Sequence, residues 1–170
     1  MSVALSLRRW IPEAKRGVTL LLGRLRAGRG DHAGLLTFSD TVTVEVELGP
    51  LANVFDEIAN RVSFLSAQGR TSLVDGIVTA LRRLPLPNGA IQAVVVLTDG
   101  RENNSKSTTD DIFSTLATYT PKGPRIHCLS YGDDTDNELL LLIARASRGT
   151  AYAGSYSGIE ELFERIGYHF

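Results

Sequence analysis

The sequence predicts a three-layer, Rossmann-like α/β domain with a mostly parallel central sheet, one antiparallel edge hairpin, and helices on both faces. Three observations predict this fold. The run Ala93-Val94-Val95-Val96-Leu97 is typical of a strand buried on both faces, because it is continuously apolar and rich in β-branched residues. Short apolar runs alternate with helical patterns along most of the chain, as they do around a parallel sheet. Residues 33–38 and 42–48, separated by the turn formers Ser39 and Asp40, indicate a hairpin.

The first half of the chain yields five elements. A helix follows Ile11, with Pro12 at a favourable first position and apolar residues at helical spacing as far as Leu25. In the second hairpin strand Val42, Val44, Val46 and Leu48 alternate with polar residues, which predicts a half-buried edge strand. Apolar residues at helical spacing then predict helices over residues 54–65 and 73–84, joined by a loop that contains Thr71.

The second half repeats the alternation around the central strand. Ser107 and Asp110 have the spacing of a capping box and predict the start of a helix after the polar loop of residues 101–109. Residues 126–130 predict a further buried strand, and Asp136 a helix cap. Gly149 predicts the end of that helix, residues 150–153 a short strand, and residues 157–160 the start of a final helix.

Composition limits the classes of function. The 170 residues fit a single domain over residues 1–170, and 43% hydrophobic and 22% charged residues are ordinary for a globular chain. The net charge of -1 favours no nucleic-acid partner. Residues 1–30 hold seven Lys or Arg against Glu13 alone, which we interpret as a solvated helix face rather than a binding surface. Cys128 is the single cysteine, so we expect a buried thiol.

We find no transmembrane segment or signal peptide in the sequence. No apolar run reaches the roughly 18 residues that a membrane helix needs, and the apolar stretch before Arg8 is too short for a signal sequence. We therefore expect no direct insertion into a membrane. The compartment of the parent protein stays open.

Common catalytic motifs are also missing. The glycines Gly28, Gly30 and Gly34 do not have dinucleotide-binding spacing, and no phosphate-binding loop is present. The three histidines are scattered without metal-ligand spacing. The pair Asp133-Asp134 follows a strand and predicts a turn.

Two oxygen-bearing residues remain as candidates. Asp99 ends the central strand, where open parallel sheets bind their ligands, and Thr71 lies in a loop that contains Gly69. A hydroxyl together with a carboxylate suits Mg²⁺, which takes few protein ligands and keeps several waters. The alternative interpretation is that Asp99 only caps the turn that follows it.

The motifs resemble a von Willebrand factor type A domain. The resemblance rests on Gly34-Leu35-Leu36-Thr37-Phe38-Ser39-Asp40, on Gly69-Arg70-Thr71-Ser72-Leu73-Val74-Asp75-Gly76, and on Val94 to Asn104, in this order and spacing. The chain is most similar to bacterial type A domains of substrate-binding-like and calcium-activated-channel-like surface proteins. The resemblance implies a metal-ion-dependent adhesion site in which Thr71 and Asp99 bind the metal, Asp99 through water, and a carboxylate of a protein partner completes the shell. A cell-surface or secreted parent protein would agree with it.

The resemblance fails at the start of the chain. The family's Asp-x-Ser-x-Ser motif would fall on Ser2-Val3-Ala4-Leu5-Ser6, so that only Ser6 matches, and the strand that should precede it is missing. Two explanations stay open: the chain is truncated at its N-terminus, or the domain has a natively degenerate metal site. In either case we expect weak binding of Mg²⁺, with Mn²⁺ as a substitute, by Thr71, Asp99 and Ser6.

We therefore predict a non-enzymatic protein-binding module with an incomplete metal site. One alternative is a scaffold domain of the same fold that binds partners without metal, through residues 101–109 and the basic first helix. Another, from a different class, is an α/β enzyme that uses Asp99 as a catalytic or phospho-accepting carboxylate. The enzyme would need a second catalytic group at a neighbouring strand end, and the sequence offers none apart from the predicted turn at Asp133 and Asp134.

Overall fold

The computed structural model describes residues 2–6, 11–25, 30–65, 69–85, 90–119, 122–131 and 135–154. Within these residues the strands are β1 (Ser2–Ser6), β2 (His32–Phe38), β3 (Val42–Pro50), β4 (Ala93–Thr98), β5 (Arg125–Tyr131) and β6 (Ala151–Gly154). The helices are α1 (Ile11–Arg24), α2 (Leu51–Phe64), α3 (Leu73–Arg83), α4 (Thr109–Ala117) and α5 (Asn137–Ala146). The last predicted helix, after residue 157, and the pair Asp133-Asp134 lie outside the described residues.

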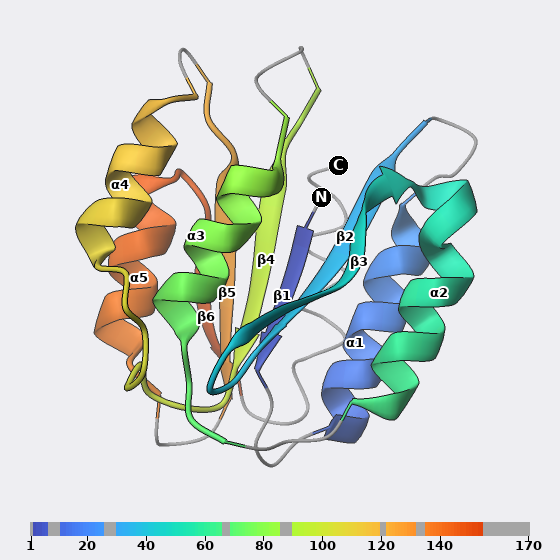
Figure 1. Cartoon of the computed structure of the whole chain (residues 1–170), viewed down its shortest axis with the longest axis horizontal. Coiled ribbons are helices and arrows are strands. Elements are labelled where there is room, and N and C mark those ends of the chain that lie inside the picture. The colour runs from blue at the N-terminus through green and yellow to red at the C-terminus, as the bar shows by residue number, and fades with distance from the viewer. Residues whose placement is uncertain are drawn as a thin grey trace.

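The six strands form one sheet in the order β3-β2-β1-β4-β5-β6. All neighbours are parallel except β2 and β3, which form the antiparallel hairpin at one edge. Figure 1 shows α1 and α2 on one face of this sheet and α3, α4 and α5 on the other. The predicted three-layer fold is therefore confirmed, including its edge hairpin.

The central strand β4 is fully buried, as its continuous apolar sequence predicts. Successive side chains of a strand point to opposite faces, so β4 contributes to two cores. Val95 and Leu97 pack with the residues of α1 and α2, whereas Val94 and Val96 pack with those of α3, α4 and α5.

The prediction that the first strand is missing is wrong. Ser2–Ser6, the residues that the resemblance assigns to the Asp-x-Ser-x-Ser motif, form β1 between β2 and β4. Ser2 pairs with Gly34 on one side and with Val94 on the other. The physical reason is hydrogen bonding: without β1, the facing edges of β2 and β4 would leave buried backbone groups unpaired.

The alternation predicted for β3 is also only partly correct. The register between β2 and β3 shifts twice, so that Leu35 opposes Val46 while Leu36 opposes Val44. Each shift adds an unpaired residue and turns the following side chains to the other face. Val46 consequently packs against the α1 and α2 layer, whereas Val44 and Leu48 pack against the opposite layer.

The helix caps match the prediction in one case and miss it by one residue in another. The Asp136 carboxylate accepts a hydrogen bond from the Leu139 N–H at 3.1 Å and caps α5, as predicted. The capping box of α4 is formed by Thr108 and Asp111 instead of Ser107 and Asp110. Hydrogen bonds from the backbone N–H and the hydroxyl of Thr108 lower the pKa of Asp111.

The described helices differ from membrane-spanning helices. None of them combines the length and the apolar character required to cross a bilayer.

Candidate functional site

The candidate site lies at the edge of the sheet where the parallel strands end, here called the carboxyl edge. Ser6, the last residue of β1, pairs with Thr98, the last residue of β4. Asp99 directly follows Thr98 and is partly buried. The topology therefore brings Ser6 and Asp99 to the same edge of adjacent strands, which is where open α/β sheets bind ligands.

Thr71 is held against the segment that follows β4. Its N–H donates to the Asn103 side-chain oxygen at 2.9 Å, and the Asn103 N–H donates back to the Thr71 carbonyl at 3.1 Å. This reciprocal pair brings Thr71 to the loop that begins with Asp99. Thr71 is 0% exposed, and its buried Oγ1 has no hydrogen-bond partner among the described residues.

Asp40, just after β2, fixes the other side of the Thr71 loop. Its carboxylate accepts a hydrogen bond from the Arg70 N–H at 2.8 Å. Gly69 has a φ of +79°, and a Cβ there would lie 2.8 Å from an Asp40 carboxylate oxygen. The positive φ favours glycine at this position, and a larger residue would also displace the Asp40 carboxylate.

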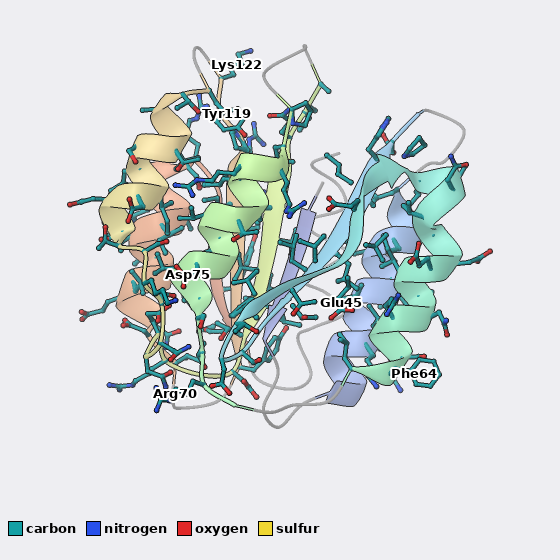
Figure 2. The ribbon with its side chains drawn as sticks, viewed as in Figure 1. Glu45, Phe64, Arg70, Asp75, Tyr119 and Lys122 are labelled. Carbon is teal, nitrogen blue, oxygen red and sulfur yellow. The ribbon has the colours of Figure 1, made fainter. Side chains whose placement is uncertain are left out.

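Asn104 joins the three segments of the site. Its side-chain amide donates to the Asp40 carbonyl and to the Ser72 hydroxyl, each at 2.8 Å. Its side-chain oxygen accepts from the Arg70 guanidinium at 3.2 Å. The loops after β2, before α3 and after β4 are therefore tied together by one side chain. Figure 2 shows Arg70 and Asp75 at this end of the molecule, far from Tyr119 and Lys122.

Glu102 acts as a strap between the β4 loop and the first turn of α3. Its carboxylate accepts hydrogen bonds from the Val74 N–H at 2.8 Å, from the N–H groups of Asn104 and Ser105, and from the Ser105 hydroxyl at 2.6 Å. The Ser105 hydroxyl oxygen in turn accepts from the Asp75 N–H at 3.0 Å. The preceding residue Ser72 makes no side-chain cap, because these partners from another loop satisfy the helix N-terminus.

Asp75 joins the same two segments in the opposite direction, because here a side chain of α3 accepts hydrogen bonds from the loop after β4. Its two carboxylate oxygens accept hydrogen bonds from the N–H groups of Lys106 at 2.9 Å and Ser107 at 2.8 Å. Burial raises the pKa of Asp75, but the hydrogen bonds from Ser107 and Lys106 and the Lys106 ammonium group outweigh this effect. The pKa is therefore held below its usual 3.8.

The donor set fits a divalent cation only in part. The orphaned Thr71 hydroxyl suits a hard cation, and Asp99 supplies one carboxylate. The nearby carboxylates of Asp40, Asp75 and Glu102 instead accept backbone hydrogen bonds. Within the described part of the chain, no group of three or more His, Cys, Asp or Glu could hold a metal. The Ser6 side chain lies outside the described side chains, so its predicted role stays a prediction.

The sequence predicts Thr71 and Asp99 as site residues but assigns no role to the residues that organise their loops. Asp40, Asp75, Glu102 and Asn104 all belong to stretches that carried the resemblance. The available signal was their chemistry, because side-chain acceptors beside helix starts commonly cap backbone N–H groups. Their partners lie about 30 residues away or further, so spacing alone could not identify them.

Sequence comparisons connect this geometry to known proteins. The family model for the von Willebrand factor type A domain matches residues 6–165. Inter-alpha-trypsin inhibitor heavy chain H6 of Homo sapiens is 25% identical over 151 residues, which are 82% of this chain and 11% of that protein. The chain therefore spans a small part of the length of this curated relative.

Solved structures share the fold at low sequence identity. A von Willebrand factor type A protein from Catenulispora acidiphila has a TM-score of 0.82 at 18% identity, covering 98% of this chain and 41% of its own. An aerotolerance-related membrane protein from Bacteroides fragilis has a TM-score of 0.75 at 14% identity, covering 99% and 98%. Proximal thread matrix protein 1 from the mussel byssus, with a zinc-occupied MIDAS motif, has a TM-score of 0.76 at 19% identity, covering 98% and 44%.

Proposed function

This chain belongs to the von Willebrand factor type A family. From that premise we propose that it binds a protein partner at its carboxyl edge through an incomplete metal site. Domains of this family are protein-interaction modules. The proposed site consists of Thr71, Asp99 and Ser6. A bound divalent cation would supply an open coordination position for a carboxylate of the partner.

The observation that carries the proposal is the buried Thr71 hydroxyl. A buried hydroxyl without a partner is costly, so a ligand atom beside it would repay that cost. The zinc-occupied MIDAS motif of proximal thread matrix protein 1 supports a metal as that ligand in the same fold. The proposed site offers one carboxylate, and we expect Mg²⁺ or Mn²⁺ to bind with a Kd on the order of 10⁻³ M or weaker.

The experiment is a Mn²⁺ titration followed by paramagnetic broadening of backbone amide signals. We expect saturable broadening at Thr71 and Gly100, lost in Thr71→Ala and in Asp99→Ala. The matched controls are Thr43→Ala and Asp56→Ala, which change exposed residues of β3 and α2 and should leave the broadening intact. Absence of localised broadening in the parent chain, or its persistence in both site variants, would refute the metal site.

A second candidate is the metal-independent scaffold. It is favoured by the rigid loop after β4, in which Glu102 and Asp75 immobilise the backbone while Arg101 and Lys106 stay exposed. Such a preformed loop binds a partner without a large ordering cost. Once a partner is known, binding that survives EDTA but is lost in Arg101→Ala would favour this candidate over the metal site.

A further inference from the structure

The opposite end of the molecule, here called the amino edge, carries a pocket that the proposed function does not use. It has a volume of about 220 Å³ and opens between the ends of α4 and α5. Its lining includes Leu116, Tyr119, Gly123, Pro124, Ser147 and Arg148. Figure 2 shows Tyr119 and Lys122 together at this end.

The walls of the pocket are fixed by hydrogen bonds within the protein. The Tyr119 hydroxyl lies within hydrogen-bond distance of the carbonyl oxygens of Leu81 and Leu84, at the end of α3. The Ser147 hydroxyl donates to carbonyl oxygens of α5 and accepts from the Ile126 N–H at 2.9 Å. Arg148 differs, since it is exposed, and the one hydrogen bond that its guanidinium makes to the described residues, to the Gly123 carbonyl, is long at 3.5 Å.

Arg148 also has an unfavourable backbone conformation. Its φ is +59°, in the left-handed region, where helices usually end on glycine. The next residue, Gly149, must itself be glycine, because a Cβ there would lie 1.9 Å from the Ile126 carbonyl oxygen. A non-glycine residue in this conformation costs about 1 kcal/mol or more. The long hydrogen bond to the Gly123 carbonyl offsets little of that cost.

The charge around Arg148 has one sign. The described segments 112–119, 122–131 and 141–154 contain four cationic side chains, Lys122, Arg125, Arg145 and Arg148, and no carboxylate side chain. All four are exposed. Cations at helix ends offset the helix dipole, and Arg145 in the last turn of α5 already does so. Stabilisation of the helix dipole therefore does not explain the presence of a second cation at Arg148.

We propose that the pocket and Arg148 bind a glutamate side chain of an acidic protein segment. In the mostly polar pocket, Leu116 and Pro124 offer contacts for the methylene groups, and the Arg148 guanidinium offers a fork for the carboxylate. The neighbouring cations attract further acidic residues of the same segment. This surface is separate from Thr71 and Asp99, so the chain would have interaction sites at both ends of its sheet.

The test uses fluorescein-labelled hexaglutamate and fluorescence anisotropy on the whole chain at low and high salt. Arg148→Gly removes the guanidinium and the backbone strain together, so loss of binding cannot be ascribed to unfolding, and its melting temperature should equal or exceed that of the parent. We expect this variant to weaken binding by about tenfold or more. Arg148→Lys keeps the charge but not the fork and should weaken it by about threefold.

The matched control is Arg16→Ala, which removes one exposed cation from α1 on another part of the surface and should change affinity by less than about twofold. Equal losses in Arg148→Gly and Arg16→Ala would show general charge attraction and overturn the proposal. Unchanged binding in Arg148→Gly would also overturn it. Displacement of the peptide by a small excess of inorganic phosphate would overturn the choice of a carboxylate ligand, whereas resistance to phosphate would support it.

Discussion

Replacing Glu102 by alanine tests whether the strap between the β4 loop and α3 stabilises the site. The substitution removes a carboxylate that accepts four hydrogen bonds, one of them from the Val74 N–H in the first turn of α3. Val74 is only 3% exposed, so water cannot easily replace the lost acceptor. The variant should therefore be less stable than the parent chain.

The magnitude follows from the kinds of hydrogen bond involved. Leaving the buried Val74 N–H without a partner costs about 1–3 kcal/mol, and loss of a helix cap typically costs about 1 kcal/mol. The bonds from Asn104 and Ser105 lie within the same loop and are partly open to water, so they add little. We expect a loss of about 2–3 kcal/mol in the free energy of unfolding, and a melting temperature lower by roughly 5–10 °C.

The measurement is urea unfolding combined with hydrogen exchange. The Val74 amide should exchange faster in Glu102→Ala, and Glu102→Gln, which keeps one acceptor oxygen, should show about half the loss of stability. The control Glu57→Ala removes an exposed carboxylate whose ion pair with Arg61 spans 4.0 Å, and it should cost less than about 0.5 kcal/mol. A Glu102→Ala variant within about 0.5 kcal/mol of the parent would refute the strap.

Four further predictions follow from single residues. Thr71→Val should raise the free energy of unfolding in metal-free buffer by about 1 kcal/mol, because it removes a buried hydroxyl without a partner, and a loss of stability in urea unfolding would contradict this. Asp75→Asn should reduce stability above pH 4 but not in strong acid. Because the pKa of Asp75 is lowered in the folded protein, the carboxylate stabilises the fold fully above the usual pKa of 3.8, and this stabilisation disappears as the pH falls through the pKa of the folded state. Unfolding curves at several pH values would reveal this dependence. Gly149→Ala should lower the free energy of unfolding by about 3 kcal/mol or more, since its Cβ would overlap the Ile126 carbonyl. A soluble variant with an unchanged melting temperature would contradict this prediction. Burial raises the pKa of Cys128 to about 12, so the thiol should react with a disulfide reagent only as fast as the protein unfolds, and rapid labelling without denaturant would be the contrary result.

The sequence predicts those parts of the fold that depend on local pattern. The β4 run, the helical spacing of α3 and the Asp136 cap all follow from neighbouring residues. The two errors that concern strands arise where a strand's partners decide its structure. Ser2–Ser6 carries too little apolar sequence to identify a central strand, and it becomes one by pairing with β2 and β4. The shifts near Leu35 depend on the register between two strands, which alternation within β3 cannot reveal.

In the candidate site, too, local sequence predicts some features and the contacts made on folding decide the others. Residue type and motif order predict Thr71 and Asp99 as metal ligands, because a hydroxyl and a carboxylate at loop positions suit a hard cation. The strap by Glu102 depends on which loops meet after folding, and this information is spread over about 30 residues of chain. The strain at Arg148 could not be predicted either, since glycine is the usual residue in its conformation and stands one position later.

The position of β1 has a consequence for the order in which the sheet can assemble. Ser2 pairs with Gly34 and Val94, and Val94 lies about 90 residues further along the chain. β1 therefore keeps one side unpaired until β4 joins it, and closing so long a loop is slow. During that interval the unpaired edge of β1 can pair with other chains. The yield of folded protein should consequently depend on how soon β4 pairs with β1.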